Sequence, residues 1–301
     1  MTAGSSSLGS ADAARRAVEA VWRIESGRLI AGLARVTQDL GLAEDLAQDA
    51  LMTALEQWPR SGIPANPAGW LMTTAKNRAI DAFRRDAVYR RKLEAVGRDR
   101  QTLQDPFAGE VGEALDDHIG DDLLRLIFTA AHPALSTDAR VALTLRCLGG
   151  LSTDEIARAF LIPESTAAQR IVRAKRTLAA HHVAFELPGP AELSDRLASV
   201  LQVIFLIFNE GYSASSGEDW MRPGLALEAM RLGRVLARLT SQEPEVHGLL
   251  ALMEIQASRL PARIDENGEP VLLSDQDRRR WDRLLIRSGL AALKLAESLP
   301  A

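Results

Sequence analysis

The chain has 301 residues, of which 47% are hydrophobic and 25% are charged, with a formal net charge of −4 at pH 7. These proportions are close to those of soluble globular proteins, so a buried core and two or three domains are expected. The single cysteine, Cys147, excludes an internal disulfide and a cysteine-rich zinc site.

No targeting or membrane segment is predicted. Residues 1–10 are rich in glycine and serine and lack a basic stretch followed by an apolar one, so they do not form a signal peptide. The most apolar window, 197–208, is interrupted by Gln202 and is too short to span a bilayer. We therefore expect a cytoplasmic protein with no membrane partner.

The charge is distributed unevenly. Residues 76–92 hold seven basic and two acidic residues, and 163–182 hold four basic residues and one acidic residue. Between these segments, 93–122 carries nine acidic residues and two arginines. Because phosphate binding depends on local charge, the net negative charge does not exclude a nucleic-acid partner.

Abundant Ala, Leu, Arg and Glu, with few β-branched or aromatic residues, predict an all-α fold. Four regions are expected: helical domains over 11–92 and 121–186, a flexible acidic linker over 93–120, and a helical C-terminal extension over 190–301. No independent strand is predicted, although 269–273 suits a short extended piece. The extension is expected to contain helices over 192–208, 223–239, 245–260 and 277–299.

In the first region, residues 42–58 have the apolar spacing of an amphipathic helix, and Pro59 is expected to prevent it from continuing smoothly. The predicted loop 60–69 is rich in Gly, Pro and Asn. A second helix is expected to start near 67–70. The polar face of the first helix comprises Glu44, Asp45, Gln48 and Asp49. The polar face of the second helix comprises Lys76, Asn77, Asp81 and Arg84.

The clearest local motif lies in the helical domain predicted over 121–186. Ser152 followed by Glu155 is a capping box that opens a helix over 153–160. A short turn, 161–163, precedes a second helix that runs to about His182. Its buried stripe is predicted to be Ala167, Ile171, Ala174 and Leu178.

This arrangement is a helix-turn-helix, in which a basic second helix enters the major groove of DNA. The exposed residues suited to bases or phosphates are Ser165, Thr166, Gln169, Arg170, Arg173, Lys175 and Arg176. The alternative interpretation is a surface helix whose charges are only solvated.

Three strings together resemble the extracytoplasmic-function (group 4) sigma factors of RNA polymerase. AEDLAQDAL (43–51) is similar to region 2.2, which meets the polymerase clamp helices. GWLMTTAKNRAIDAFRR (69–85) is similar to regions 2.3–2.4, which open and read the −10 element. LTLRCLGGLSTDEIA (143–157) and the helix after it are similar to region 4, which reads the −35 element.

The resemblance assigns roles residue by residue. Asp45, Gln48 and Asp49 match the polymerase-contact positions, although a solvated acidic helix face explains them equally well in isolation. The positions that match −10 contacts are Arg60, Asn66, Lys76, Asn77, Arg84 and Arg85. The positions that match −35 contacts are the seven exposed residues named above in the helix that follows the turn 161–163. The loop 60–69 lacks an aromatic residue before Trp70, so hydrogen bonds would have to hold a flipped base.

The strings FLIFNEGYSAS (205–215) and LLSDQDRRRWD (272–282) resemble sigma factors with a C-terminal extension related to tetratricopeptide repeats. That extension usually continues further, so a shortened chain is one expectation. Asn209, Glu210 and Tyr212 are either a functional cluster or a polar helix end capped by Gly211. The hypothesis is that the extension regulates activity by docking on the sigma domains or on polymerase.

The predicted partners are therefore core RNA polymerase and promoter DNA, with no cofactor and no metal. Contacts between the extension and the sigma domains are a hypothesis, and an anti-sigma protein is left open. One rival is a stand-alone helix-turn-helix regulator with a C-terminal sensor. A helical enzyme is the other rival, and its candidate residues are Asp116, Asp117, His118, His181 and His182. It is disfavoured because the sequence has no phosphate loop or nucleophile motif.

Overall fold

The computed structural model describes residues 4–94, 119–213, 221–266 and 269–300, with the side chains of 4–11, 85–94 and 119 left aside. Within these ranges the secondary structure is helical, which confirms the all-α prediction. An isolated antiparallel bridge joins Ile264 to Pro270, which lies within the segment 269–273 expected to be extended. Most of the predicted linker, and with it Asp116, Asp117 and His118, lies outside the described residues.

The chain divides into two compact units. The first comprises residues 1–126 with 183–186, and the second comprises 127–182 with 187–301.

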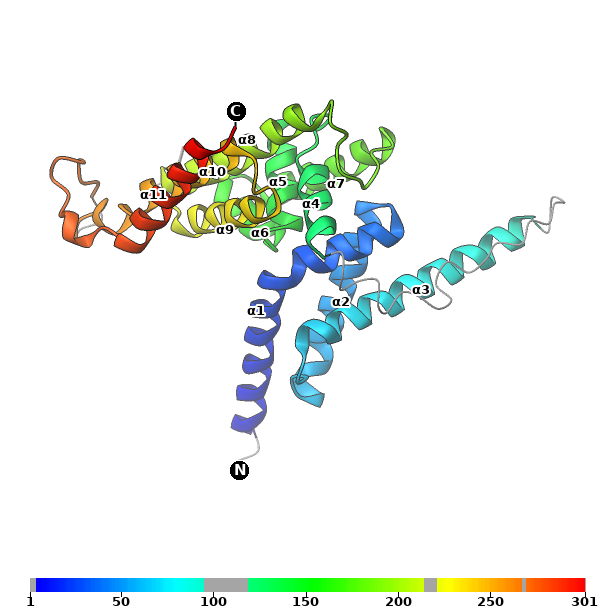
Figure 1. The fold of residues 1–301 in the computed structure, drawn as a ribbon. Coiled ribbons are helices and arrows are strands. Elements are labelled where there is room, and N and C mark those ends of the chain that lie inside the picture. The colour runs from blue at the N-terminus through cyan, green and yellow to red at the C-terminus, as the bar shows by residue number, and fades with distance from the viewer. Residues whose placement is uncertain (1–3, 95–118, 214–220, 267–268, 301) are drawn as a thin grey trace. The chain divides into compact units, whose positions relative to one another are not determined.

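In the first unit, α1 (Gly4–Thr37) packs against both α2 (Leu40–Ser61) and α3 (Pro67–Glu94) (Figure 1). Asp39 caps the start of α2, since its side chain accepts a hydrogen bond from the Leu42 amide at 3.0 Å. Ile30, Trp58 and Leu71 are fully buried and bring all three helices into one core. The burial of these large side chains outweighs the modest helix propensity of each segment.

Two features of α2 differ from expectation. The helix includes Pro59 and continues to Ser61, past the predicted end at residue 58. In the last turn a proline removes only one hydrogen bond, and the Gly62 amide closes the end by donating to the Trp58 carbonyl at 3.0 Å. Glu44, expected on the polar face, is 2% exposed because it lies one turn from the buried residues Leu40 and Ala47.

The second unit begins with the end of α4 (Ile119–Ala130), followed by α5 (Thr137–Cys147), α6 (Thr153–Phe160) and α7 (Glu164–Ala180). The predicted helix-turn-helix is confirmed in its first helix, its turn and the start of its second helix. Ser152 and Glu155 form the capping box, with hydrogen bonds of 3.1 and 2.8 Å. The buried residues of α7 are the predicted stripe of Ala167, Ile171, Ala174 and Leu178.

The rest of the second unit is a series of helices that pack on their neighbours. α8 (Leu193–Tyr212) packs on α9 (Pro223–Leu239), α9 on α10 (Pro244–Ala257), and α10 on α11 (Arg283–Ser298) (Figure 1). Two short 3-10 helices, η1 (Leu260–Ala262) and η2 (Arg278–Arg280), lie between α10 and α11. α8 also contacts α5, so the extension and the helix-turn-helix belong to the same compact unit.

One interpretation of the sequence had Gly211 as the cap of α8. It is not the cap, because the helix ends at Tyr212 and Ser213 is the C-cap residue. The role of Gly211 is close packing. A Cβ atom built on Gly211 would lie 2.2 Å from the backbone nitrogen of Ala226, at the start of α9. Only glycine therefore allows α8 and α9 to approach this closely.

We predict that Gly211→Ala lowers the free energy of unfolding by roughly 2 kcal/mol, because the methyl group meets backbone rather than a flexible side chain. Gly248→Ala in α10 is the matched control, since a Cβ atom there meets nothing within 4 Å. It should raise stability by about 0.5–1 kcal/mol through helix propensity. Urea denaturation followed by circular dichroism measures both, and equal effects would contradict the packing role.

Candidate polymerase and promoter interfaces

The residues predicted to contact polymerase lie on the outer side of α2. Asp45 and Asp49 are one helical turn apart and exposed, and Gln48 beside them is half-buried. Asp49 also forms an ion pair with Arg78 of α3 at 3.4 Å, and Arg78 donates a hydrogen bond to Thr53 at 2.6 Å. The acidic face of α2 is thus held against α3 by an arginine whose role the sequence did not reveal.

The residues predicted to contact the −10 element are spread along α3 and the loop before it. Asn77 and Arg84 are exposed and, seven residues apart, project from one side of α3. Lys76 is half-buried. Arg85 is in α3, but its side chain lies outside the described residues.

The loop between α2 and α3 is shorter than predicted, because α2 includes Arg60 and α3 begins at Pro67. Arg60 is exposed at the end of α2. Asn66 is also exposed, and its Oδ1 accepts the Gly69 amide hydrogen at 3.0 Å, which caps α3. Trp70 is half-buried and packs edge-to-face on the buried Trp58, with ring centroids 5.5 Å apart, so its ring borders the core.

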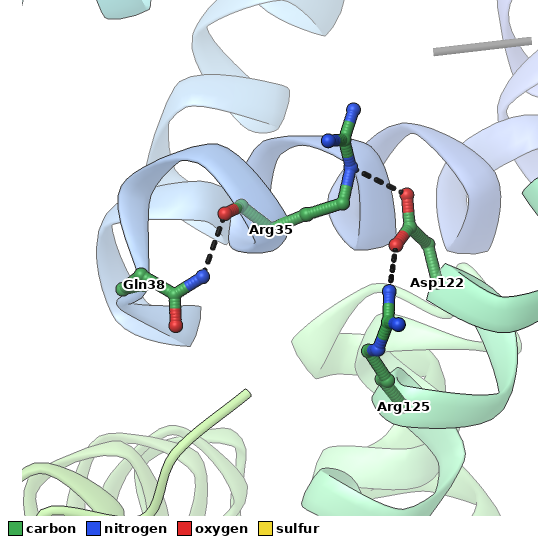
Figure 2. A network of polar contacts seen from close by, with 4 residues as sticks. All are labelled: Arg35, Gln38, Asp122 and Arg125. Carbon is green, nitrogen blue, oxygen red and sulfur yellow. Dashed lines mark hydrogen bonds and ion pairs between the residues drawn. The ribbon is translucent and has the colours of Figure 1, made fainter. Parts of the chain in front are cut away.

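A buried carboxylate anchors the beginning of α4 to α1 within the first unit (Figure 2). Asp122 is 2% exposed and accepts hydrogen bonds from Arg35 at 2.9 Å and from Arg125 at 2.7 Å. Gln38 donates to the Arg35 backbone carbonyl at 2.7 Å. Asp122, which the sequence groups with the acidic connector, is therefore a structural residue at a helix N-terminus.

The helix-turn-helix presents one polar face. Gln169, Arg173 and Arg176 are exposed, and their spacing of four and three residues places them on the side of α7 opposite the buried stripe. Ser165 is exposed in the first turn of α7, and Thr166 beside it is half-buried. Within the described part of the chain, no carboxylate pairs with Arg173 or Arg176, so both guanidinium groups can meet phosphate or guanine.

Arg170 and Lys175 differ from these residues. Arg170 is half-buried and forms an ion pair with Asp138 of α5 at 2.8 Å, so its guanidinium is already engaged. Lys175 is half-buried on the flank of α7. The sequence placed Arg170 with the DNA contacts because spacing alone does not reveal a carboxylate that arrives from another helix.

His132, which the sequence did not single out, lies in the turn between α4 and α5. Its Nδ1 accepts the Ala134 amide hydrogen at 3.1 Å, so this nitrogen carries no proton. Burial lowers the pKa of His132 below its usual 6.5, and the Arg196 guanidinium lowers it further. Glu192 opposes this shift, and His181 adds to it. The neutral imidazole is therefore the native form.

No group of His, Cys, Asp and Glu in the described ranges could hold a metal ion. Within the same part of the chain, no helix combines the length and apolar character needed to cross a membrane.

Three protein-family models match successive parts of the chain. Sigma-70 region 2 matches residues 24–88, and Sigma-70, region 4 matches 125–178. A family of unknown function (DUF6596) matches 196–297, which covers most of the extension. Two sigma-70 regions in one helical chain define the class of RNA polymerase sigma factors.

Two relatives extend this result. Uncharacterized protein R00370 of Rhizobium meliloti is 44% identical over 265 residues, which cover 88% of this chain and 62% of the relative. The ECF RNA polymerase sigma factor SigL of Mycobacterium tuberculosis is 33% identical over 145 residues, or 48% of this chain and 76% of SigL. No solved structure matches the chain. This chain belongs to the family of ECF RNA polymerase sigma factors.

The lowered pKa of His132 predicts a pH dependence of stability. An unfolded histidine takes up a proton below about pH 6.5, whereas native His132 resists it, so the free energy of unfolding should fall as pH drops below this value. His132→Asn keeps a side-chain acceptor for the Ala134 amide and should reduce the fall. Urea denaturation at about pH 7.5 and about pH 5.5 measures the fall in the free energy of unfolding between these pH values. The exposed His182→Asn is the control, and an equal pH dependence in His132→Asn and wild type would contradict the assignment.

Proposed function

We propose that this sigma factor binds core RNA polymerase and directs initiation by recognising both the −10 and the −35 promoter elements. The observation that carries the proposal is the exposed face of α7, where Gln169, Arg173 and Arg176 follow one another at helical spacing. A helix-turn-helix with such a face suits the major groove. The match to Sigma-70 region 2 supports a second recognition surface and a polymerase contact in residues 24–88.

The polymerase contact is assigned to the acidic face of α2. Asp45 and Asp49 are exposed on consecutive turns, and Gln48 lies beside them. Exposed carboxylates attract a basic partner surface and orient it before contact. Because the ion pair between Asp49 and Arg78 is exposed on both sides, it is weak enough to exchange for a partner.

The −10 contact is assigned to α3 and the loop before it. Asn77 and Arg84 face the same side of α3, and Lys76, Arg60 and Asn66 add polar groups nearby in the sequence. Arg85 belongs to the same assignment on the strength of its sequence position alone. Asparagine and arginine combine base-edge and phosphate contacts, which a helix beside an opening duplex requires.

The −35 contact is assigned to α7. Ser165, Thr166 and Gln169 occupy its N-terminal half, which approaches the base edges in a helix-turn-helix. Arg173 and Arg176 are placed to bind phosphates or guanine. Arg170, with its ion pair to Asp138, and Lys175 are assigned to the edge of the contact.

Arg173→Ala should reduce transcription from a −35-dependent promoter by roughly tenfold, because it removes one charged contact with DNA. Run-off transcription with purified core polymerase measures the effect. If Arg173 meets a phosphate, the slope of log affinity against log salt should also fall by about one. Arg158→Ala, an exposed arginine on α6 that is paired with Asp154, is the matched control and should leave transcription unchanged.

Unchanged transcription and salt dependence in Arg173→Ala would remove α7 from promoter recognition. If the wild-type chain binds promoter duplex tightly by itself and does not associate with core polymerase, the stand-alone regulator is the correct interpretation.

We further propose that the extension regulates activity by bracing region 4. Side chains of the extension donate hydrogen bonds to backbone carbonyls where the helices of region 4 end. Arg196 and Ser199 of α8 donate to Phe128 and Ala131, at 3.2 and 2.6 Å, and Arg231 of α9 donates to Leu148 at 2.6 Å. Arginine at a helix C-terminus both satisfies open carbonyls and interacts favourably with the helix dipole.

Apolar packing accompanies these hydrogen bonds. A small cavity is lined from one side by Ile127, Ala131 and Leu148 and from the other by Val203 and Leu232. Val203 and Leu232 are 1% and 2% exposed, so removing the extension would expose part of the core shared with region 4. Point substitutions at the contact are therefore a better test of regulation than truncation.

α5 connects the extension to the recognition helix. Its Arg140 donates to Ser199 of α8 at 2.5 Å, and its Asp138 forms the ion pair with Arg170 of α7. A shift of α8 is thereby transmitted through one rigid helix to α7. This contiguous chain of contacts is the physical basis of the proposed regulation.

Arg231→Ala removes the donor to the Leu148 carbonyl and should lower transcription by roughly threefold, in the range found for coupling between packed elements. Association with core polymerase, measured by gel filtration, should be unchanged because α2 is untouched. Arg238→Ala is the matched control, since Arg238 is exposed on the same helix. Transcription equal to or above that of the wild-type chain would rule out a bracing role for the extension.

A further inference from the structure

The extension holds a group of hydrogen-bond donors that promoter recognition does not use. Tyr212 ends α8, and its ring stacks on Phe208 with centroids 5.5 Å apart. The guanidinium carbons of Arg263 and Arg259 lie 3.8 and 5.9 Å from the centre of the Tyr212 ring. Two cations therefore share one aromatic ring, and Tyr212, Arg259 and Arg263 are called the Tyr212 cluster below.

Internal hydrogen bonds hold the cluster in place but use only part of its donors. Arg259 Nη2 donates to the phenol oxygen of Tyr212 at 2.7 Å and also to Gln256, and Arg263 donates to the Tyr212 backbone carbonyl. Arg259 Nε is buried and has no acceptor in the described ranges. Because the phenol oxygen accepts from Arg259, its own proton is directed elsewhere, and no described residue accepts it. The cluster is rich in donors and short of acceptors.

Within the described ranges, no carboxylate compensates the charge of the cluster. Neither Arg259 nor Arg263 forms an ion pair with a carboxylate that the structure describes. Elsewhere in the same unit, Arg222 is paired with Glu210, and Arg234 is paired with the fully buried Glu254. Among the described residues, the guanidinium groups of Arg259 and Arg263 meet the Tyr212 ring instead of a carboxylate, an arrangement that an anion can complete.

Two segments with distinctive sequence strings meet beside the cluster. The first, 205–215, contains Tyr212 itself. The second, 272–282, arrives through Asp282, whose amide donates to the carbonyl of Ser258, the residue before Arg259, at 2.8 Å. Trp281, next to Asp282, has a buried indole N–H without an acceptor among the described residues. Both strings lie outside the residues that Sigma-70 regions 2 and 4 match.

We propose that the Tyr212 cluster is a binding site for a small oxyanion, the carboxylate or phosphate group of a small molecule. An oxyanion only accepts hydrogen bonds, and it would take them from Arg259, Arg263 and the Tyr212 hydroxyl together. Guanidinium groups match the geometry of such anions and form charge-assisted bonds with them. The ring of Tyr212 orients both guanidinium groups before the anion arrives, which reduces the entropy lost on binding.

Calorimetric titration of the full chain with sodium phosphate, and separately with sodium acetate, tests the proposal at constant ionic strength maintained with sodium chloride. At least one anion should give a saturable, single-site heat. Arg259→Gln should weaken that binding about tenfold, since it removes a charged donor. Tyr212→Phe keeps the aromatic ring and should weaken it about threefold. Arg238→Gln, an exposed arginine of α9, is the matched control and should bind as the wild-type chain does.

The two anions distinguish the source of the ligand. Tighter binding of phosphate assigns a phosphate ester, and tighter binding of acetate assigns a carboxylic acid. The proposal is overturned if neither anion gives saturable heat beyond that of chloride. Wild-type affinity in Tyr212→Phe also overturns it, and this variant keeps the test valid if circular dichroism finds Arg259→Gln unfolded. None of these outcomes depends on promoter recognition.

Discussion

The carbonyl groups at the ends of α4 and α5 need hydrogen-bond donors, and α8 and α9 supply them. Arg196, Ser199 and Arg231 reach these carbonyls from the extension, and apolar residues of the same helices fill the space beside them. An open carbonyl against an apolar surface is costly, so these contacts make the helix-turn-helix and the extension one cooperative body. The second unit therefore behaves as one structural element.

The helix α5 links the extension to α7. It contacts the extension through Arg140 and the recognition helix α7 through Asp138, and these two residues are two positions apart in the chain. The Asp138 ion pair orients the middle of α7, while Arg173 and Arg176 further along remain available to DNA. The chain thus separates an arginine that positions the helix from arginines that can bind a partner. A net charge of −4 is compatible with this, because phosphate contacts depend on the local face.

Three buried carboxylates of the described chain, Asp122, Glu210 and Glu254, are each paired with arginine. Asp122 lies between Arg35 and Arg125 in the first unit, and Glu210 and Glu254 each accept an arginine in the second. Such pairs contribute little net stability, but each is expensive to break once buried. The Tyr212 cluster differs from these three pairs, since its two arginines meet an aromatic ring and no described carboxylate.

Features that depend on neighbours within a turn or two were predictable from the order of residues alone. The Ser152 capping box, the start of α7 and its buried stripe follow from local hydrogen bonding and helical spacing, and all were predicted. Tertiary structure alone decided which face of α2 holds Glu44, which carboxylate meets Arg170, and why residue 211 is glycine. These depend on side chains and backbone that arrive from elsewhere in the chain, and periodicity within one helix carries no information about them.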